Sequence, residues 1–178
     1  MKYNRRMLAT GVFVAVAVMN GNAFAETKLD DATIFAIFDE TNTADVWAAR
    51  IAVKKAHSEN VRELGKMVAT DHEAVQQMWR DMAKKLGVIP APPQNDTSAE
   101  KLAKTVALLQ SKSGLEFDKV YLQHEIVFHQ SVIDAIKGTL LPAIKNEQFR
   151  ALVNQALPGF EHHLVETRAL AKKLGVEP

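Results

Sequence analysis

The sequence predicts an all-α fold, an up-down four-helix bundle with a short extra helix between the second and third long helices. Apolar residues recur every three or four positions over four long segments, which places them on one face of an α-helix. Glycine or proline follows the last three of these segments, as at many helix ends. No stretch alternates with the period of two that is typical of a β-strand.

The first 25 residues have the pattern of a secretory signal peptide. Basic Lys2, Arg5 and Arg6 precede an apolar run at 7–18, and Ala23-Phe24-Ala25 provides the small residues of a cleavage site. The run is shorter than the roughly 20 residues of a membrane-spanning helix. We therefore expect cleavage after Ala25, a periplasmic location and no membrane span in the mature chain. An uncleaved N-terminal anchor is the alternative.

The remaining residues, 26–178, have the length of one domain. The signal segment holds three of the 22 basic residues and none of the 21 acidic ones, so the mature chain has a net charge of −2. This balance gives no reason to expect nucleic-acid binding. The absence of cysteine excludes disulfides, thiolate metal sites and thiol catalysis. No Gly-x-Ser-x-Gly turn or phosphate-binding loop is present, which favours a non-catalytic protein.

The first two helices are expected at 31–56 and 58–86. Asp30 or Asp31 can cap the first helix, because a carboxylate accepts hydrogen bonds from the free amides of the first turn. A serine opens the second helix, and Gly87 ends it.

A proline-rich linker at 90–96 separates the second helix from a shorter one at 97–112. The third long helix is expected at 115–140 and should end before Pro142. The fourth is expected at 146–174 and ends at a glycine. It contains Pro158, which removes one backbone hydrogen bond and should kink the helix.

Four polar side chains interrupt the apolar faces, one on each long helix: Asp45, His72, His129 and His163. Burying a polar group without partners costs about 2–7 kcal/mol. These four side chains should therefore either be one another's partners or share a metal ion.

Three imidazoles and one carboxylate suit a mononuclear site for a divalent transition metal such as zinc or copper. A di-iron centre is disfavoured, because the Glu-x-x-His pairs of such bundles are missing. Four further polar residues are expected around the site: Asp71, Asp118, Tyr121 and Glu125. The alternative is a purely structural polar core in which the same groups hydrogen-bond to one another.

The heights of the four residues along the bundle agree only in part. At 1.5 Å per residue, Asp45 and His72 match within about one turn. His163 and His129 differ by roughly 9 Å, which a kink at Pro158 and the preceding loop would have to absorb.

Several motifs resemble one bacterial family. These are Asp71-His72 after an apolar segment, Phe117-Asp118-x-x-Tyr121 after Ser113-Gly114, His129, and Leu157-Pro158 before a histidine. In this order they resemble the bacterial domain of unknown function 4142 family, whose members are exported, ferritin-like four-helix bundles. The resemblance implies that the family's histidines fall on His72, His129 and His163. It also places Asp45 where a glutamate is usual, and it implies no established reaction.

The function expected from the sequence is that of an exported, non-catalytic helical bundle with a mononuclear metal site in its core. The alternative is an envelope or stress-related structural or interaction module whose buried cluster is only a polar core. A redox or hydrolytic metalloenzyme is a third, weaker option.

Overall fold

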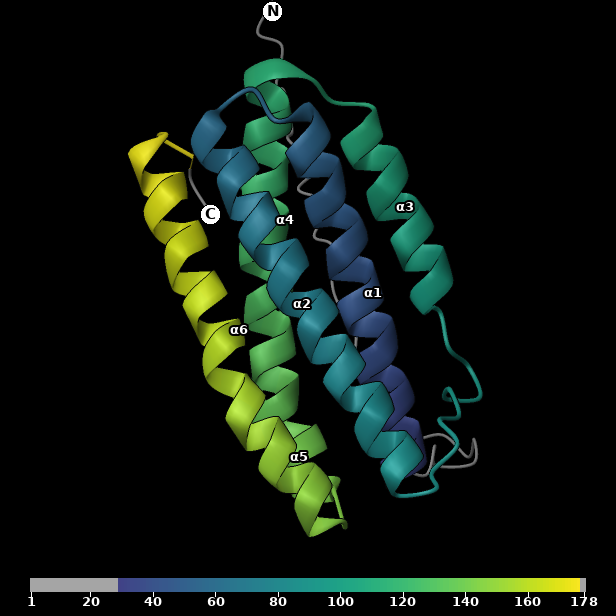
Figure 1. Ribbon diagram of the computed structural model, residues 1–178. Helices are drawn as coiled ribbons and strands as arrows, with labels where there is room; N and C mark the ends of the chain where they lie inside the picture. The colour runs from purple at the N-terminus through teal and green to yellow at the C-terminus, as the bar shows by residue number, and fades with distance from the viewer. Residues whose placement is uncertain (1–28, 177–178) are drawn as a thin grey trace, which may run out of the picture.

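Figure 1 shows the computed structural model of the chain, in which residues 29–176 are described. The expected signal segment and its cleavage site lie outside these residues. The described residues form helices and connecting loops without a β-strand, as expected. The helices are α1 (Asp31–Lys55), α2 (Glu59–Lys85), α3 (Ser98–Gln110), α4 (Gly114–Ala135), the π-helical turn η1 (Ile136–Leu140), α5 (Leu141–Ala143) and α6 (Glu147–Lys173).

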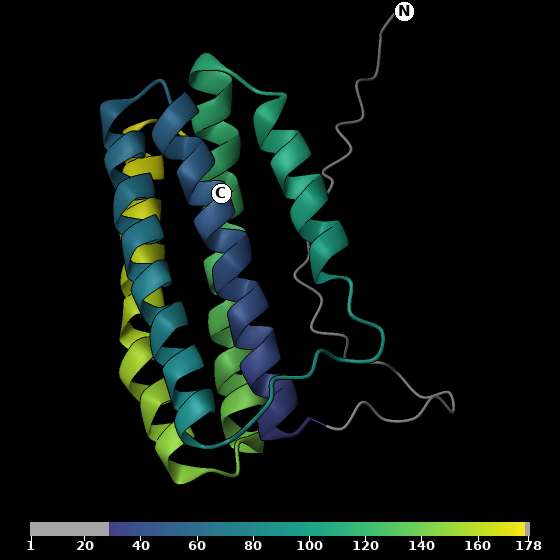
Figure 2. The ribbon, with the colours of Figure 1, turned by 45° about the vertical axis from the view of Figure 1, so that its right-hand side comes forward.

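The four long helices α1, α2, α4 and α6 lie side by side, and the shorter α3 lies along the outside of α1 (Figures 1 and 2). At one end of the molecule the start of α1 meets two loops. The backbone amide of Ala91, after α2, donates to the carbonyl of Ala32, and the backbone amide of Lys145, before α6, donates to the carboxylate of Asp31.

At the other end, the last turn of α1 meets the end of α3 and the start of α4. The Lys55 amine donates to the carbonyl of Leu109 at 3.3 Å, and the His57 amide donates to Asp118 at 2.8 Å. The linker and α3 thus carry the chain back along the molecule. As a result α2 and α4 run in the same direction, which differs from the simple up-down order expected from the sequence (Figure 1).

The interface between α1 and α2 is close because its residues are small. A Cβ built on Gly65 would lie 3.0 Å from the Ala49 carbonyl oxygen and 3.1 Å from the Ala52 Cβ. Nearer the start of α1, aromatic rings fill the core. Phe35 stacks on Phe149 with ring centroids 3.7 Å apart.

The helix that follows α3 extends further than expected. The chain stays helical from α4 through the π-helical turn and α5, so that it passes Pro142 and ends at Ala143 rather than before the proline. The three added residues correspond to about 4.5 Å of rise. They remove about half of the height difference expected between His129 and His163. The last helix, α6, continues through Pro158.

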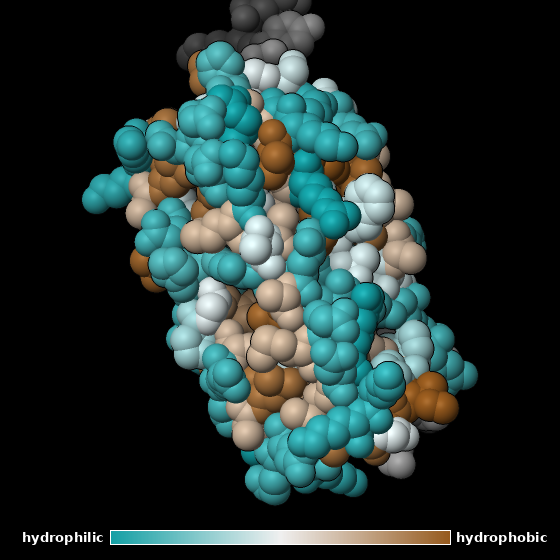
Figure 3. All heavy atoms as spheres, viewed as in Figure 1, coloured by the Kyte–Doolittle hydropathy of each residue, from teal (hydrophilic) through white to brown (hydrophobic). Residues whose placement is uncertain are grey.

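The surface in the view of Figure 3 is mostly hydrophilic, with smaller apolar patches. None of the helices in the described residues has both the length and the apolar character needed to cross a lipid bilayer.

Candidate metal centre

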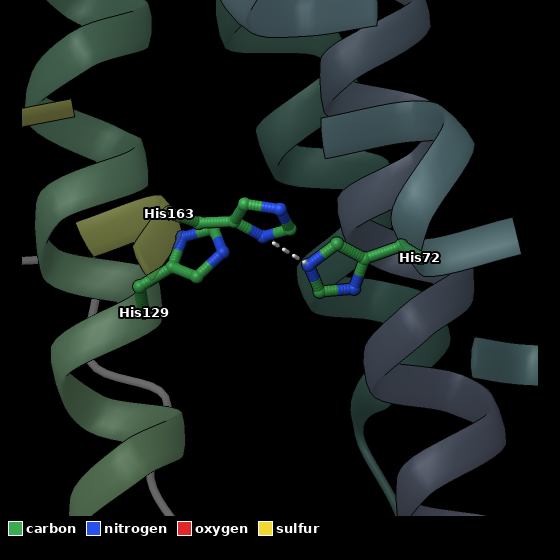
Figure 4. Close-up of side chains that lie close together, drawn as sticks. All are labelled: His72, His129 and His163. Atoms are coloured by element: carbon green, nitrogen blue, oxygen red, sulfur yellow. Dashed lines mark hydrogen bonds between the residues drawn. The ribbon is translucent and has the colours of Figure 1, made fainter. Parts of the chain in front are cut away.

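The four polar residues expected at the core meet in one place inside the bundle. His72 comes from α2, His129 from α4 and His163 from α6, and their imidazoles face one another (Figure 4). Asp45 joins them from α1. None of the four residues is more than 2% exposed. The arrangement therefore brings all four expected residues together in a site closed to solvent.

The inner atoms of the cluster lie close together. His72 Nε2 is 3.0 Å from Asp45 Oδ2 and 3.2 Å from His163 Nδ1. His129 Nε2 is 3.4 Å from the same Asp45 oxygen. One nitrogen from each histidine lies within 4.8 Å of the other two, and Asp45, Glu125 and His129 form a second group of this kind, so each group could hold a single ion.

The outer nitrogen of His72 is held by a residue that sequence analysis missed. His72 Nδ1 lies 2.9 Å from the side-chain oxygen of Asn42, whose own amide nitrogen donates to the Phe38 carbonyl at 2.7 Å. Because that second bond orients the amide, the Asn42 oxygen faces His72, so Nδ1 must be the donor. Asn42 lies one turn before Asp45 in an apolar face, and this spacing was the available signal.

The outer nitrogens of the other two histidines also meet acceptors. His129 Nδ1 lies 3.1 Å from the backbone carbonyl of Glu125, and His163 Nε2 lies 2.9 Å from the carboxylate of Asp71. Neither oxygen can donate, so each of these ring nitrogens carries the proton. In a neutral imidazole the opposite nitrogen then presents a lone pair.

The hydrogen bond between His72 Nε2 and His163 Nδ1 needs a proton on one of the two nitrogens. While all three imidazoles are neutral, the centre contains four acceptor atoms and no donor among them. They are His72 Nε2, His129 Nε2, His163 Nδ1 and Asp45 Oδ2. The two Asp45 oxygens and His129 Nε2 have no hydrogen-bond partner in the described residues. Facing lone pairs repel unless a cation lies between them, and acceptors on the outer ring nitrogens are the usual arrangement around metal-bound histidines.

Burial keeps the imidazoles in the form that binds metal. Loss of solvation lowers the pKa of His129 to about 4, against the opposing charge of Asp45. Burial also lowers the pKa of His163, although its contact with Asp71 acts in the other direction. Both rings are therefore neutral at pH 7, as metal ligands must be.

The carboxylate of Asp45 stays ionised. Burial opposes its charge, but the positive charges that His72 and His129 acquire on protonation outweigh this and lower its pKa. Beside it, burial and the charge of Asp45 raise the pKa of Glu125 well above its usual value. The uncharged form of Glu125 is therefore favoured beside the Asp45 carboxylate.

Three of the four residues expected around the site are found there. Glu125 is fully buried next to Asp45 and His129. The Tyr121 hydroxyl is buried on the same side, where burial and the charges of Glu125 and Asp45 raise its pKa well above 10. Asp71 contacts His163 across the interface rather than its own neighbour in sequence, His72.

The fourth, Asp118, lies elsewhere. Its two oxygens accept from the backbone amides of His57 and Ser58, each at 2.8 Å. It therefore holds the turn between α1 and α2, where the Ser58 side chain makes no capping bond. The shared helix face suggested a role beside His129, but Asp118 lies three turns away along the helix.

Comparison with known proteins places the chain in a family. The family model described as a domain of unknown function, DUF4142, matches residues 17–170. The chain belongs to this family. The DUF4142 match includes all four residues of the centre. No curated protein and no solved structure matched the chain.

Proposed function

We propose that this protein binds one divalent transition-metal ion, zinc or copper, through His72, His129, His163 and Asp45. The observation that carries the proposal is the convergence of three histidine nitrogens within 4.8 Å of one another, with an Asp45 oxygen beside two of them, in a core closed to solvent. Neutral imidazole and carboxylate are ligands of both metals. A metal ion is the partner that this set of atoms lacks.

The role that fits this site is metal sequestration rather than catalysis. Four protein ligands fill a tetrahedral coordination sphere, whereas a catalytic zinc keeps one position open for water or substrate. The ligands are almost completely buried, so a substrate has no direct access to the ion. Together with the signal-like N-terminus, this supports an exported, ferritin-like four-helix bundle that holds metal in the bacterial envelope.

One contact favours a second candidate, a structural polar core without metal. His72 Nε2 is close enough to Asp45 Oδ2, at 3.0 Å, for a protonated His72 to donate to that oxygen. A proton would then take the place of the metal ion. The cluster would serve to set the register of the helices, as buried polar networks can do.

The two candidates predict different responses to metal. After treatment with EDTA, zinc or copper at a hundredfold excess over Kd should stabilise the protein by about 2.7 kcal/mol, and EDTA should reverse the gain. Thermal unfolding at neutral pH measures this shift. Equal melting curves with and without zinc and copper would exclude metal binding and leave the polar core.

Two adjacent histidines provide a matched pair of variants. His163→Gln removes one ligand and should abolish the metal-dependent shift. His162→Gln makes the same change at the neighbouring exposed position and should leave the shift intact. A full shift in the His163 variant would contradict the proposed ligand set.

A further inference from the structure

One carboxylate that contacts the cluster, that of Asp71, reaches the molecular surface. The Asp71 side chain is 52% exposed, whereas the His163 side chain that it contacts is 3% exposed. The His163 ring therefore lies between solvent and the centre. Its Nε2 faces the Asp71 oxygen at 2.9 Å, and its Nδ1 faces His72 at 3.2 Å.

A groove lies between α2 and α6, the two helices that carry Asp71 and His163. Its volume is about 380 Å³, and its lining includes Leu64 and Met67 on α2 and Glu166 and Leu170 on α6. Asp71 lies four residues after Met67, and His163 lies three residues before Glu166, so both continue the helix faces that line the groove. The two helices lie side by side in both ribbon views (Figures 1 and 2).

We propose that metal ions enter the centre from this groove and are bound first by Asp71. This proposal rests on the proposed function. The negative charge of the exposed Asp71 attracts a divalent cation to the surface beside the groove, and this attraction raises the local cation concentration and the rate of association. The ion then passes the His163 ring, which is the side chain that contacts both Asp71 and the inner cluster.

The entry role differs from mere orientation of His163. An orienting acceptor stabilises the bound state, so its loss changes mainly the dissociation rate and the Kd. An entry residue acts mainly on the path, so its loss slows association by a larger factor than it raises the Kd. The substitution Asp71→Asn separates the two roles, since the amide keeps a side-chain oxygen for the His163 N–H but loses the charge.

The experiment follows zinc transfer from a chromophoric zinc indicator to EDTA-treated protein by stopped-flow absorbance. Equilibrium competition with the same indicator gives the Kd. Asp71→Asn should lower the association rate constant about tenfold, which is more than it raises the Kd, and should leave the stoichiometry unchanged. In wild type, association should slow as salt is added, and this dependence should weaken in the variant.

Glu73→Gln is the matched control. It removes one negative charge from the same helix at similar exposure. Glu73, however, forms an ion pair with Arg50 on α1 and has no contact with His163. It should load zinc at the wild-type rate.

An unchanged association rate in Asp71→Asn, or an equal slowing in Glu73→Gln, would overturn the entry role while leaving zinc binding itself intact. A wild-type protein that binds no zinc would instead refute the proposed function, and the entry role with it.

Discussion

His72 on α2 and Asp45 on α1 face each other with Nε2 3.0 Å from Oδ2, deep between the helices. The Asn42 amide on the far side of the ring makes His72 Nδ1 the donor, so a neutral His72 turns a lone pair toward a carboxylate. Two acceptors in this position need either a proton or a metal ion between them. The properties of the apo protein therefore depend on how the buried cluster is protonated.

Stability of the EDTA-treated protein should fall in mild acid. The pKa of His129 is about 4 in the folded chain against 6.5 ordinarily, so between these values the unfolded state binds more protons. The contribution of neutral His129 to the free energy of unfolding is therefore complete above pH 6.5 and is lost as pH falls toward 4. Urea unfolding should show a loss on the order of 2 kcal/mol between pH 7 and pH 5 from His129 alone. A His129→Gln variant with the same pH dependence would contradict this origin.

Glu125→Gln should be tolerated. Because burial and Asp45 raise the Glu125 pKa, the uncharged form of the side chain is favoured, and glutamine has nearly the same size and is also uncharged. We expect less than about 1 kcal/mol of destabilisation for glutamine, and about 1–3 kcal/mol more for Glu125→Ala, which removes a polar group from beside the buried Asp45 carboxylate. Chemical denaturation of the apo variants measures both. A large loss in the glutamine variant would show that Glu125 is ionised.

Asp118→Ala should weaken the fold without touching the metal centre. The change leaves the His57 and Ser58 amides without their acceptor, at a cost of about 1–3 kcal/mol. Asp134→Ala, at an exposed position on the same helix, should change stability by less than about 0.5 kcal/mol. The zinc-dependent shift in melting temperature should be equal in both variants. Loss of that shift in Asp118→Ala would instead support the position beside the histidines that the sequence predicted for Asp118.

Gly65→Ala should destabilise the α1–α2 interface. The added methyl would lie 3.0 Å from the Ala49 carbonyl oxygen, which is backbone and has little freedom to move, so we expect a loss of about 1–3 kcal/mol. Gly159→Ala on α6 meets no neighbour within 4 Å and should gain up to about 1 kcal/mol from helix propensity. Thermal unfolding of the pair tests this, and equal effects would argue against a close approach at Gly65.

Export should remove the first 25 residues. Mass spectrometry of material from a bacterial periplasm should find Glu26 as the N-terminus, and Ala25→Leu should block processing because the site needs a small residue there. A substitution at Ala9, outside the cleavage site, serves as the control. Recovery of an intact Met1 or Lys2 terminus would show an uncleaved anchor instead.

Helix positions and the inner residues of the centre could be predicted from the sequence because both depend on local periodicity. A polar residue in an apolar helix face is buried wherever that helix packs, so Asp45, His72, His129 and His163 had to share the core. Asp118 shows the limit of this reasoning. Periodicity tells which residues share a face, but a residue three turns along the same face meets different neighbours.

The sequence by itself therefore determined the all-helical class, the four helix faces and the four side chains that meet between them. Tertiary structure alone decided that α2 and α4 run in the same direction, because this depends on how far the linker and α3 carry the chain. It also decided which ring nitrogen of each histidine turns inward. The inward nitrogen is set by the acceptor at the opposite ring nitrogen, which is Asn42, Asp71 or the Glu125 carbonyl. Two of these three acceptors lie on a different helix from their histidine, so spacing along the chain cannot reveal them.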